Sequence, residues 1–393
     1  MQMKLANIIN SNLNHYEYGL LTTIQESELP NNKILYCKEI LNCERYDNSL
    51  CGKFKAVLVF VGKTAQISNN RTIPILQIDK EIHFEEGKSI IKIDYKKSIV
   101  SQLAVINKGS IDLYLTGKCN QNCFACPSPE TSRNDTEPKD EALRIASLLD
   151  GVNTHINVTG GEPTYYNDYF IDVIKTLQEK APKSSIQVLT NAISFSNDKF
   201  VEKITKSDIK MDKILFSVAI YGSNNTIQDL AVGIKNSLPI LDKALLNLIN
   251  LKAMIELRVV ITQYNYKDLE NISDYIIKKY RGNILRVVFM GLEMSGNARK
   301  NQEKVWIDFE NHNLYLENAI LKLMNNGIRV RLYNYPLCYL KKNYWTLSKD
   351  SISYWKKKFM PDCNHCRVKA YCSGFFAATI PFIKKVYPIQ GDK

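Results

Sequence analysis

The sequence has few of the features that mark membrane, secreted or repetitive proteins. Its longest apolar runs are Ala56–Val61 and, if Gly, Thr and Pro are admitted, Gly374–Ile383, whereas a membrane-spanning helix needs about 20 apolar residues. The opening residues MQMKLANIINSNLNHYE lack the apolar stretch of a secretory signal. Gly (17) and Pro (12) are not abundant among the 393 residues, and we find no internal repeat or low-complexity linker. We therefore expect a cytoplasmic globular protein of two or three domains, without a membrane span.

The sequence does contain ten cysteines and a formal net charge of +12. Cytoplasmic thiols are kept reduced, so clustered cysteines suggest metal ligation more than disulfides. The charge is compatible with a nucleic acid, with an acidic peptide or with no specific partner. Much of it comes from residues 301–393, which carry 15 Lys and Arg against 7 Asp and Glu. No RNA-binding module is recognisable and the aromatic residues are dispersed, so a nucleic-acid partner is not expected.

Hydrophobic patterning divides the chain into three segments. Residues 1–107 hold short runs rich in Ile and Val, which predict a small β-rich N-terminal domain. Such a domain has sheet edges to which a substrate or leader peptide can add as a strand. Residues 301–393 form the third segment, with an expected helix at Trp306–Met324, a strand at Ile328–Tyr333 and a cysteine-rich tail.

In the middle segment, residues 108–300, strand-like and helix-like stretches alternate. The expected strands are Ile111–Leu115, Ile156–Val158, Ile186–Leu189, Ile214–Ile220, Ile255–Ile261 and Leu285–Met290. The expected helices include Lys139–Leu149, Tyr169–Lys180, Pro239–Leu251 and Asp268–Tyr280. This alternation predicts an α/β fold with a parallel sheet. If the sheet curves, it is a partial (β/α)6 TIM-like barrel, with its chemistry on the loops after the strand C-termini.

Three cysteines follow the first of these strands directly. The stretch DLYLTGKCNQNCFACPSPE places Cys119, Cys123 and Cys126 in a Cys-x3-Cys-x2-Cys pattern. Three thiolates in one loop can ligate three irons of a cubane cluster and leave its fourth iron open to a substrate. A zinc knuckle or three reduced thiols are the alternatives, but zinc usually takes four protein ligands and no fourth Cys or His lies nearby.

The next expected strand leads into NVTGGEPT. Gly160 and Gly161 permit close approach of the backbone to a ligand, and Glu162 adds a carboxylate that can receive an ammonium group. By itself Gly-Gly-Glu most often marks a turn. One βα unit after the three cysteines, it indicates a ligand site.

Together these two motifs resemble the radical S-adenosylmethionine (SAM) superfamily, over about residues 109–300. The resemblance implies that Cys119, Cys123 and Cys126 hold a [4Fe–4S] cluster whose open iron chelates SAM, and that Gly160, Gly161 and Glu162 contact the SAM amino group. It also implies reductive cleavage of SAM to a 5'-deoxyadenosyl radical.

Further SAM contacts are implied by the same resemblance. Thr190 and Asn191 occupy the place of a Thr-Asn-Gly motif near the ribose or carboxylate, although Ala192 replaces its Gly. Ser217 is expected near SAM, and Arg258 faces either a carboxylate or an ion-pair partner elsewhere. Phe124 corresponds to an aromatic residue near the adenine, or is an ordinary packing residue.

A second group of cysteines lies in the tail, at Cys338, Cys363, Cys366 and Cys372. Four thiolates suit either a fully ligated [4Fe–4S] cluster or a zinc site. We favour ligation by all four over ligation by three, and expect His365 to face solvent. The arrangement resembles the twitch or SPASM extensions of peptide-modifying radical SAM enzymes, which implies an auxiliary cluster for electron transfer or structure. Cys37, Cys43 and Cys51 match no ligand pattern.

Three C-terminal stretches, Val287–Asn301, Arg331–Leu340 and Ser351–Phe376, resemble the HxsC family of His-Xaa-Ser maturases. That resemblance implies oxidoreductase-type modification of a ribosomally made precursor peptide (RiPP). The implied partners are the precursor, a second radical SAM protein and a flavodoxin- or ferredoxin-like electron donor. An RNA-modifying radical SAM enzyme and a non-catalytic metal-binding scaffold are the alternatives.

Overall fold

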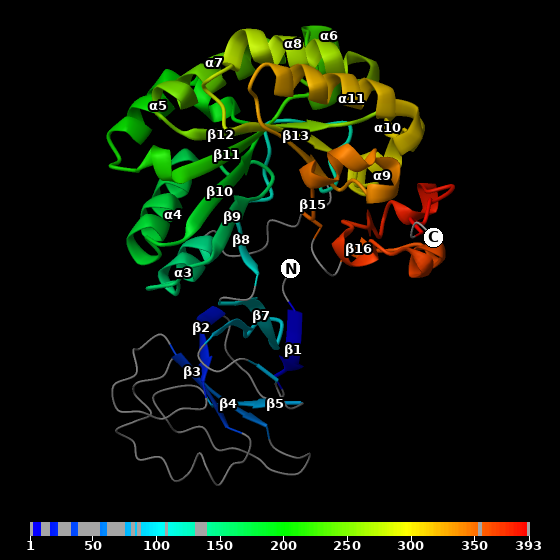
Figure 1. Ribbon diagram of the computed structural model, residues 1–393. Coiled ribbons are helices and arrows are strands. Elements are labelled where there is room, and N and C mark those ends of the chain that lie inside the picture. The colour runs from blue at the N-terminus through cyan, green and yellow to red at the C-terminus, as the bar shows by residue number, and fades with distance from the viewer. Residues whose placement is uncertain are drawn as a thin grey trace. The chain divides into compact units, whose positions relative to one another are not determined.

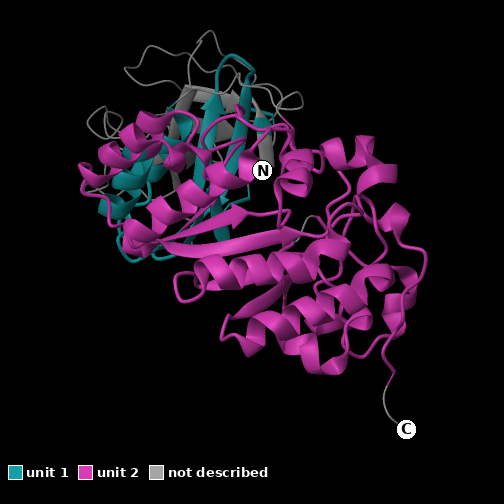
Figure 2. Ribbon diagram, turned by 90° about the horizontal axis from the view of Figure 1, so that it is seen from above, with its two compact units in different colours: residues 1–114, 138–158, 171–186 teal, residues 115–137, 159–170, 187–393 magenta. Residues whose placement is uncertain are grey.

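A computed structural model describes residues 3–8, 16–22, 33–37, 56–60, 75–79, 83–84, 88–106, 109–129, 140–352 and 356–390 (Figure 1). The chain divides into two compact units, coloured separately in Figure 2. One unit comprises Met1–Tyr114, Pro138–Val158 and Ile171–Ile186; the other comprises Leu115–Glu137, Thr159–Phe170 and Gln187–Lys393. Cys43 and Cys51 lie outside the described residues, and Cys37 ends a strand.

The N-terminal residues form a sheet of seven strands in the order β1-β7-β6-β2-β3-β4-β5. Its strands are β1 (Met3–Asn7), β2 (Tyr16–Thr22), β3 (Lys33–Cys37), β4 (Ala56–Phe60), β5 (Ile75–Ile78), β6 (Ser89–Asp94) and β7 (Ile99–Val105). Strands β2 to β5 run parallel, whereas β1, β7, β6 and β2 pair antiparallel. All seven strands lie within residues 1–107, where the sequence predicts a β-rich N-terminal domain. A bridge between Ile8 and Ile78 links the two ends of the strand order, so neither edge is wholly open to an added strand.

A second sheet has eight strands in the order β15-β14-β13-β12-β11-β10-β9-β8. They are β8 (Ser110–Tyr114), β9 (His155–Thr159), β10 (Ser185–Thr190), β11 (Ile214–Ala219), β12 (Met254–Val260), β13 (Arg286–Met290), β14 (Val330–Tyr333) and β15 (Ser348–Lys349). Strands β11 to β15 pair in parallel. The expected α/β fold with a curled, partial TIM-like barrel is confirmed. The sheet has two strands more than the six expected, because β14 and β15 continue it beyond residue 300.

Helices line the outer face of this curved sheet (Figure 1). They are α3 (Glu141–Ser147), α4 (Asn167–Lys180), α5 (Asp198–Thr205), α6 (Asn225–Val232), α7 (Ser237–Asn250), α8 (Leu269–Tyr280) and α11 (Phe309–Asn325). Two short helices, α9 (Gly296–Lys300) and α10 (Gln302–Val305), belong instead to the connection between β13 and α11. Helix α7 buries Leu238, Leu241, Leu245 and Leu248, the spacing of one apolar helical face. Among the described residues, no helix is long and apolar enough to cross a bilayer.

Side chains along each strand alternate between the face covered by helices and the concave face of the sheet. Phe216 and Val218 of β11 are fully buried, and Phe216 packs against Phe195 with ring centroids 5.3 Å apart. Successive side chains of a strand point to opposite faces, so Ser217 and Ala219 point to the concave side. By the same alternation, Leu257 and Val259 of β12 point toward the helical layer. Glu256 and Arg258 point to the concave face. The concave face is therefore polar, whereas the helical layer holds the core.

Candidate active site

The loop that carries Cys119, Cys123 and Cys126 follows the end of β8. Helix α6 holds this loop, because the amide of Asn122 donates to the carbonyl of Val232 (3.1 Å) and that of Phe124 to Ala231 (2.9 Å). The last carbonyl groups of a helix have no partner within the helix. The loop thus satisfies helix-end carbonyls and is fixed by them.

Helix α9 holds the same loop from its other side. Its Asn297 donates from the backbone amide to the carbonyl of Cys126 (2.8 Å) and from Nδ2 to the carbonyl of Cys123 (3.0 Å). Asn301 Nδ2 donates to the carbonyl of Phe124 (3.0 Å). Gly296, the first residue of α9, approaches closely, since a Cβ on it would lie 2.5 Å from the carbonyl oxygen of Pro127. A residue without a side chain is therefore required at this contact.

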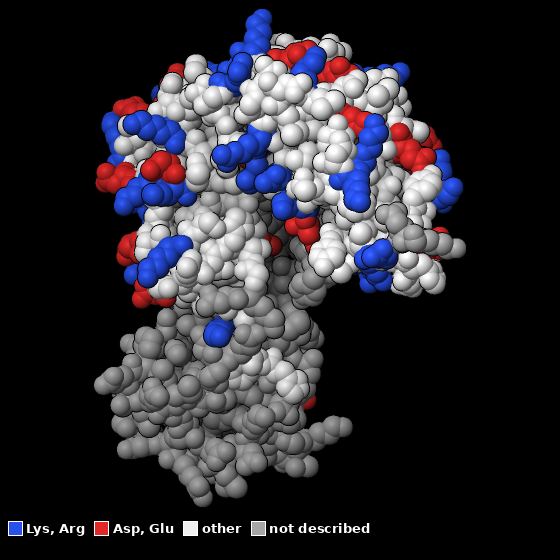
Figure 3. Space-filling model, in the orientation of Figure 1, with Lys and Arg blue, Asp and Glu red and all other residues white. Residues whose placement is uncertain are grey.

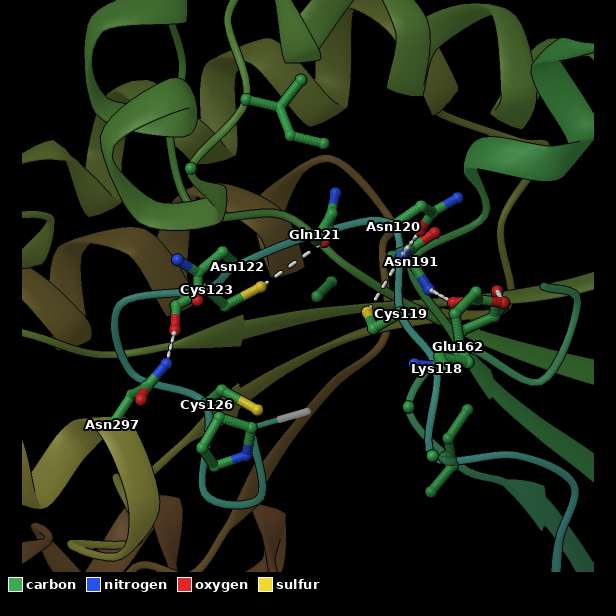
Figure 4. Close-up of a pocket in the computed structure, with 18 of the residues that line it drawn as sticks. Lys118, Cys119, Asn120, Gln121, Asn122, Cys123, Cys126, Glu162, Asn191 and Asn297 are labelled. Atoms are coloured by element: carbon green, nitrogen blue, oxygen red, sulfur yellow. Dashed lines mark hydrogen bonds between the residues drawn. The ribbon is translucent and has the colours of Figure 1, made fainter. Parts of the chain in front are cut away.

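The three cysteines line one cavity of about 740 Å³. Figure 4 shows their sulfur atoms turned toward the same space. All three side chains are partly exposed; Cys123 Sγ lies 3.4 Å from Gln121 Oε1 and Cys119 Sγ lies 3.9 Å from Asn191 Nδ2. A cavity of this size falls within the range of about 300–1,000 Å³ of small-molecule and cofactor sites. The cysteine loop is therefore one wall of a site large enough for a cofactor.

Glu162 forms part of another wall and ties two loops together. Its side chain is only 1% exposed. Oε1 accepts hydrogen bonds from the amide (3.0 Å) and hydroxyl (2.6 Å) of Thr164 and from the hydroxyl of Thr190 (2.6 Å), and Oε2 accepts from the amide of Asn191 (2.7 Å). Burial raises the pKa of Glu162, and these hydrogen bonds oppose the rise. Glu162 therefore fixes the loops that follow β9 and β10.

Most of the site residues predicted from the sequence meet at this cavity. Its lining includes Cys119, Cys123, Cys126, Gly161, Glu162, Thr190 and Asn191. Gly160 sits behind it, where a Cβ would lie 2.6 Å from the carbonyl oxygen of Thr116. Because of that close approach, the backbone amide of Gly161 donates to the same carbonyl (2.7 Å) and the backbone amide of Glu162 donates to the carbonyl of Lys118 (2.8 Å).

The structure places Phe124, Ser217 and Arg258 outside this lining. Phe124 packs against an apolar cluster that includes Leu292 and Met294, which agrees with the packing interpretation. Arg258 Nε donates to Glu256 (2.6 Å), which agrees with its ion-pair interpretation. Ser217 donates to the same carboxylate (2.9 Å).

Several residues that line the cavity were not identified from the sequence. They are Gly117, Lys118, Asn120, Gln121, Asn122, Pro129, Leu189, Ala219, Tyr221, Gly233, Ile234 and Asn297. Burial raises the pKa of the Tyr221 phenol well above 10, and nearby Cys123 adds to that rise. Only the residues next to the cysteines could have been found from the sequence, because they lie in the same motif loop. Tyr221 and Asn297 are distant in sequence and are brought to the cavity by the fold.

A single metal ion and an iron–sulfur cluster require different spacings of their protein ligands. Across the described part of the chain, no three Cys, His, Asp or Glu side chains come close enough together to hold a single metal ion. A [4Fe–4S] cluster distributes its thiolates over separate iron atoms. Three thiols around a common cavity therefore fit such a cluster better than a lone zinc ion.

The four C-terminal cysteines meet at a second, much smaller cavity. Cys338, Cys363, Cys366 and Cys372 all line it, and His365 is exposed and does not. The space holds about 20 Å³, which is room for about one water molecule. A cluster held by all four would need the surrounding loops to move outward.

Backbone amides point at two of these sulfur atoms. Leu337 N and Gly374 N lie 3.4 and 3.5 Å from Cys372 Sγ, and Ile389 N lies 3.4 Å from Cys366 Sγ. Burial, reinforced by the neighbouring thiols, raises the pKa of Cys338 to about 11. Metal ligation requires the thiolate form; burial opposes that form at Cys338, whereas the amide donors favour it at Cys366 and Cys372.

Comparison with known families identifies the middle of the chain. The sequence model of the radical SAM superfamily matches residues 113–276. The chain therefore contains a radical SAM domain, which includes the three-cysteine loop, Glu162 and Asn191. No protein with a curated description matches the chain.

Several solved structures are similar in fold. SuiB of Streptococcus suis, bound to the precursor peptide SuiA, is 18% identical with a TM-score of 0.46, over 62% of this chain and 52% of that chain. Native anSMEcpe with bound AdoMet is 15% identical with a TM-score of 0.44, over 57% and 63%. A radical SAM methyltransferase from Sphaerobacter thermophilus is 11% identical with a TM-score of 0.43, over 65% and 75%. The chain thus spans about half the length of SuiB, and these similarities are too low to transfer a substrate.

Proposed function

We propose that this chain, which contains a radical SAM domain, is an enzyme whose Cys119, Cys123 and Cys126 hold a [4Fe–4S] cluster that binds SAM. The observation that carries the proposal is the convergence of three thiols of the matched region on one cavity of about 740 Å³. When bound, the cluster and SAM supply a 5'-deoxyadenosyl radical that removes a hydrogen atom from a substrate.

The protein's own residues position and enclose this chemistry. Helices α6 and α9 hold the cysteine loop through its backbone, so the thiols keep their spacing before a cluster is bound. Glu162, Gly160 and Gly161 present the backbone beside the place where an amino group would lie, and Asn191 and Thr190 close the adjoining wall. Preorganisation of this kind lowers the cost of ordering a bound cofactor.

We propose further that the substrate is a ribosomally made precursor peptide of the His-Xaa-Ser type. Support comes from the three C-terminal stretches that resemble the HxsC family and from the four-cysteine tail. In this proposal Cys338, Cys363, Cys366 and Cys372 bind an auxiliary [4Fe–4S] cluster, a flavodoxin- or ferredoxin-like protein donates electrons and a second radical SAM protein acts beside this one. Residues 1–107 would bind the precursor, and deleting residues 1–100 should weaken precursor binding while sparing SAM cleavage.

Iron analysis tests the cofactor part of the proposal. Wild-type protein should contain about eight irons after reconstitution, and a Cys119/Cys123/Cys126→Ala variant about four. Unchanged iron in that variant would contradict ligation by this loop. Co-expression with a His-Xaa-Ser precursor tests the substrate part: the precursor should change mass with wild type but not with the triple variant, and an unchanged mass in both would contradict it.

An RNA substrate is the second candidate, and surface charge does not favour it. On the face shown in Figure 3, Lys and Arg side chains are interspersed with Asp and Glu. Three tail lysines form ion pairs, Lys356 with Glu293, Lys357 with Asp350 and Lys384 with Asp308. Steep loss of RNA affinity with rising salt would nevertheless favour RNA over peptide.

A further inference from the structure

A charged cluster on the concave face of the second sheet lies apart from both cysteine sites. Its centre is Glu256 of β12, which is fully buried. Glu256 Oε1 accepts from Arg258 Nε (2.6 Å) and Ser217 Oγ (2.9 Å), and Oε2 accepts from Arg286 Nε (2.5 Å). Gln187 Nε2 in turn donates to Ser217 Oγ (2.7 Å). Every oxygen of the carboxylate is thus used to hold neighbouring side chains.

Strand register brings a third arginine to the same face. In the strand register, Glu256 of β12 lies opposite Arg286 of β13, and Arg258 of β12 lies opposite Val288 of β13. Val288 in turn lies opposite Arg331 of β14. Because residues opposite each other in adjacent strands share a face, Arg331 points to the concave side with the other two arginines. The guanidinium of Arg258 lies 5.5 Å from the ring centroid of Tyr333, the next residue of that face on β14.

The cluster carries more positive than negative charge. Among the described residues, Glu256 is the one carboxylate that pairs with Arg258 and Arg286. Burial raises the pKa of Glu256, but the two guanidinium groups outweigh burial and hold that pKa below its ordinary value. Within the described residues, Arg331 makes no ion pair; its Nη1 lies 3.4 Å from the carbonyl oxygen of Val330. Two guanidinium groups therefore share one carboxylate, and a third, that of Arg331, lies on the same face without an ion-pair partner among the described residues.

An excess of partly buried like charge is unfavourable unless an anion joins it. Arginine is the side chain best suited to a carboxylate, because its planar fork of donors matches the two oxygens. The side chains of Arg258 and Arg286 remain 18% and 26% exposed, so part of each is accessible to solvent. The cluster is thus organised for an anion that comes from outside the chain.

The cluster lies on the strands that follow the proposed active site in the sheet order. Ala219 of β11 lines the cavity of the three cysteines and lies opposite Arg258 of β12 in the strand register. The arginines follow on the next strands in the order β12, β13 and β14. An anion bound at Arg286 and Arg331 would therefore lie on the β13–β14 side of that cavity.

We propose that Arg286, which Glu256 positions, and Arg331 together bind a carboxylate group of the peptide substrate. This inference rests on the proposed function and deepens it, because it predicts an acidic residue or a free C-terminus near the residue that is modified. SAM also carries a carboxylate, and Arg258 stands nearer to the cofactor cavity. The test must therefore distinguish the two sources.

The test uses reconstituted full-length enzyme and two probes, N-acetyl-glutamate and its neutral isostere N-acetyl-glutamine, followed by ligand-observed NMR with and without saturating SAM. The acid should bind and the amide should not. The Arg331→Gln variant should raise the Kd of the acid roughly ten-fold or more. Arg331 is the residue of choice because its loss leaves Glu256 paired. Arg281→Gln, at an exposed residue, removes the same charge and should leave the Kd unchanged.

Three results would overturn the inference: no binding of the acid, equal binding of acid and amide, or equal affinity in the Arg331→Gln variant and wild type. Displacement of the acid by SAM, with weaker SAM binding in the Arg331→Gln variant, would assign the arginines to the cofactor and overturn it as well. Formation of 5'-deoxyadenosine is measured on the same samples. Absent SAM cleavage with intact acid binding would contradict the proposed function, whereas SAM cleavage without acid binding would contradict only the carboxylate site.

Discussion

The contact between α9 and the cysteine loop can be tested at Gly296. This residue has φ +55°, and a Cβ on it would lie 2.5 Å from the carbonyl oxygen of Pro127 and 2.7 Å from that of Cys126. Both neighbours are backbone atoms and cannot turn aside as a side chain can. Gly327 is a matched control, because its φ is +75° but nothing lies within 4 Å of the added Cβ.

The expected cost of each substitution follows from these contacts. A left-handed conformation costs an alanine about 1–2 kcal/mol, offset by about 0.4–1 kcal/mol through the less flexible unfolded chain. Gly327→Ala should therefore lower the free energy of unfolding by about 1 kcal/mol. Gly296→Ala must also displace packed backbone, which adds about 1–3 kcal/mol, for a total of about 2–4 kcal/mol. That displacement moves the carbonyl of Cys126 away from its donor Asn297.

Two measurements on the same preparations read out this prediction. Denaturant unfolding ranks the two variants, and iron content after reconstitution reports the state of the cysteine loop. Gly296→Ala should be the less stable variant and should retain less iron, whereas Gly327→Ala should retain the iron of wild type. Equal stability and equal iron in the two variants would refute the claim that α9 holds the loop in place.

Two further predictions concern a buried histidine and the tail. Burial lowers the pKa of His312, whose Nε2 lies 2.6 Å from the Tyr335 hydroxyl, to about 4. Because the unfolded chain takes up the proton first, stability should be lost as the pH falls from about 6.5 toward 4, by about 3 kcal/mol. Thermal unfolding against pH should show this loss in wild type and in His365→Gln, an exposed control, but not in His312→Gln. Replacing Cys363 and Cys372 by Ala should remove about four irons and abolish peptide modification while 5'-deoxyadenosine still forms; loss of both products would contradict separate roles.

Local patterns in the sequence were sufficient for the fold and for the centre of the site. The expected strands Ile214–Ile220 and Leu285–Met290 agree with β11 and β13 to within one residue, because apolar runs bounded by polar residues specify strands locally. The cysteine loop and Glu162 were found because they lie directly after consecutive strands, where parallel sheets place ligand sites. Each of these signals is contained within a few neighbouring residues.

Contacts between distant residues carried no comparable signal. Asn297 lies 174 positions from Cys123, whose carbonyl it binds. Arg258 was expected at the cofactor or in an ion pair, and only the folded sheet shows the pair with Glu256 and the proximity of Arg286. Strand β15 is two residues long and has no pattern of its own, so its pairing with β14 could not be predicted. These features depend on tertiary packing, which overrides local preference.

Formation of 5'-deoxyadenosine tests the central claim most directly. Reconstituted wild-type protein is incubated anaerobically with SAM and dithionite, and the products are quantified by chromatography and mass spectrometry beside the Cys119/Cys123/Cys126→Ala variant. We expect 5'-deoxyadenosine and methionine from wild type and neither from the variant. Absence of 5'-deoxyadenosine from iron-loaded wild type, or equal amounts from both proteins, would contradict a SAM-cleaving role for the three-cysteine loop.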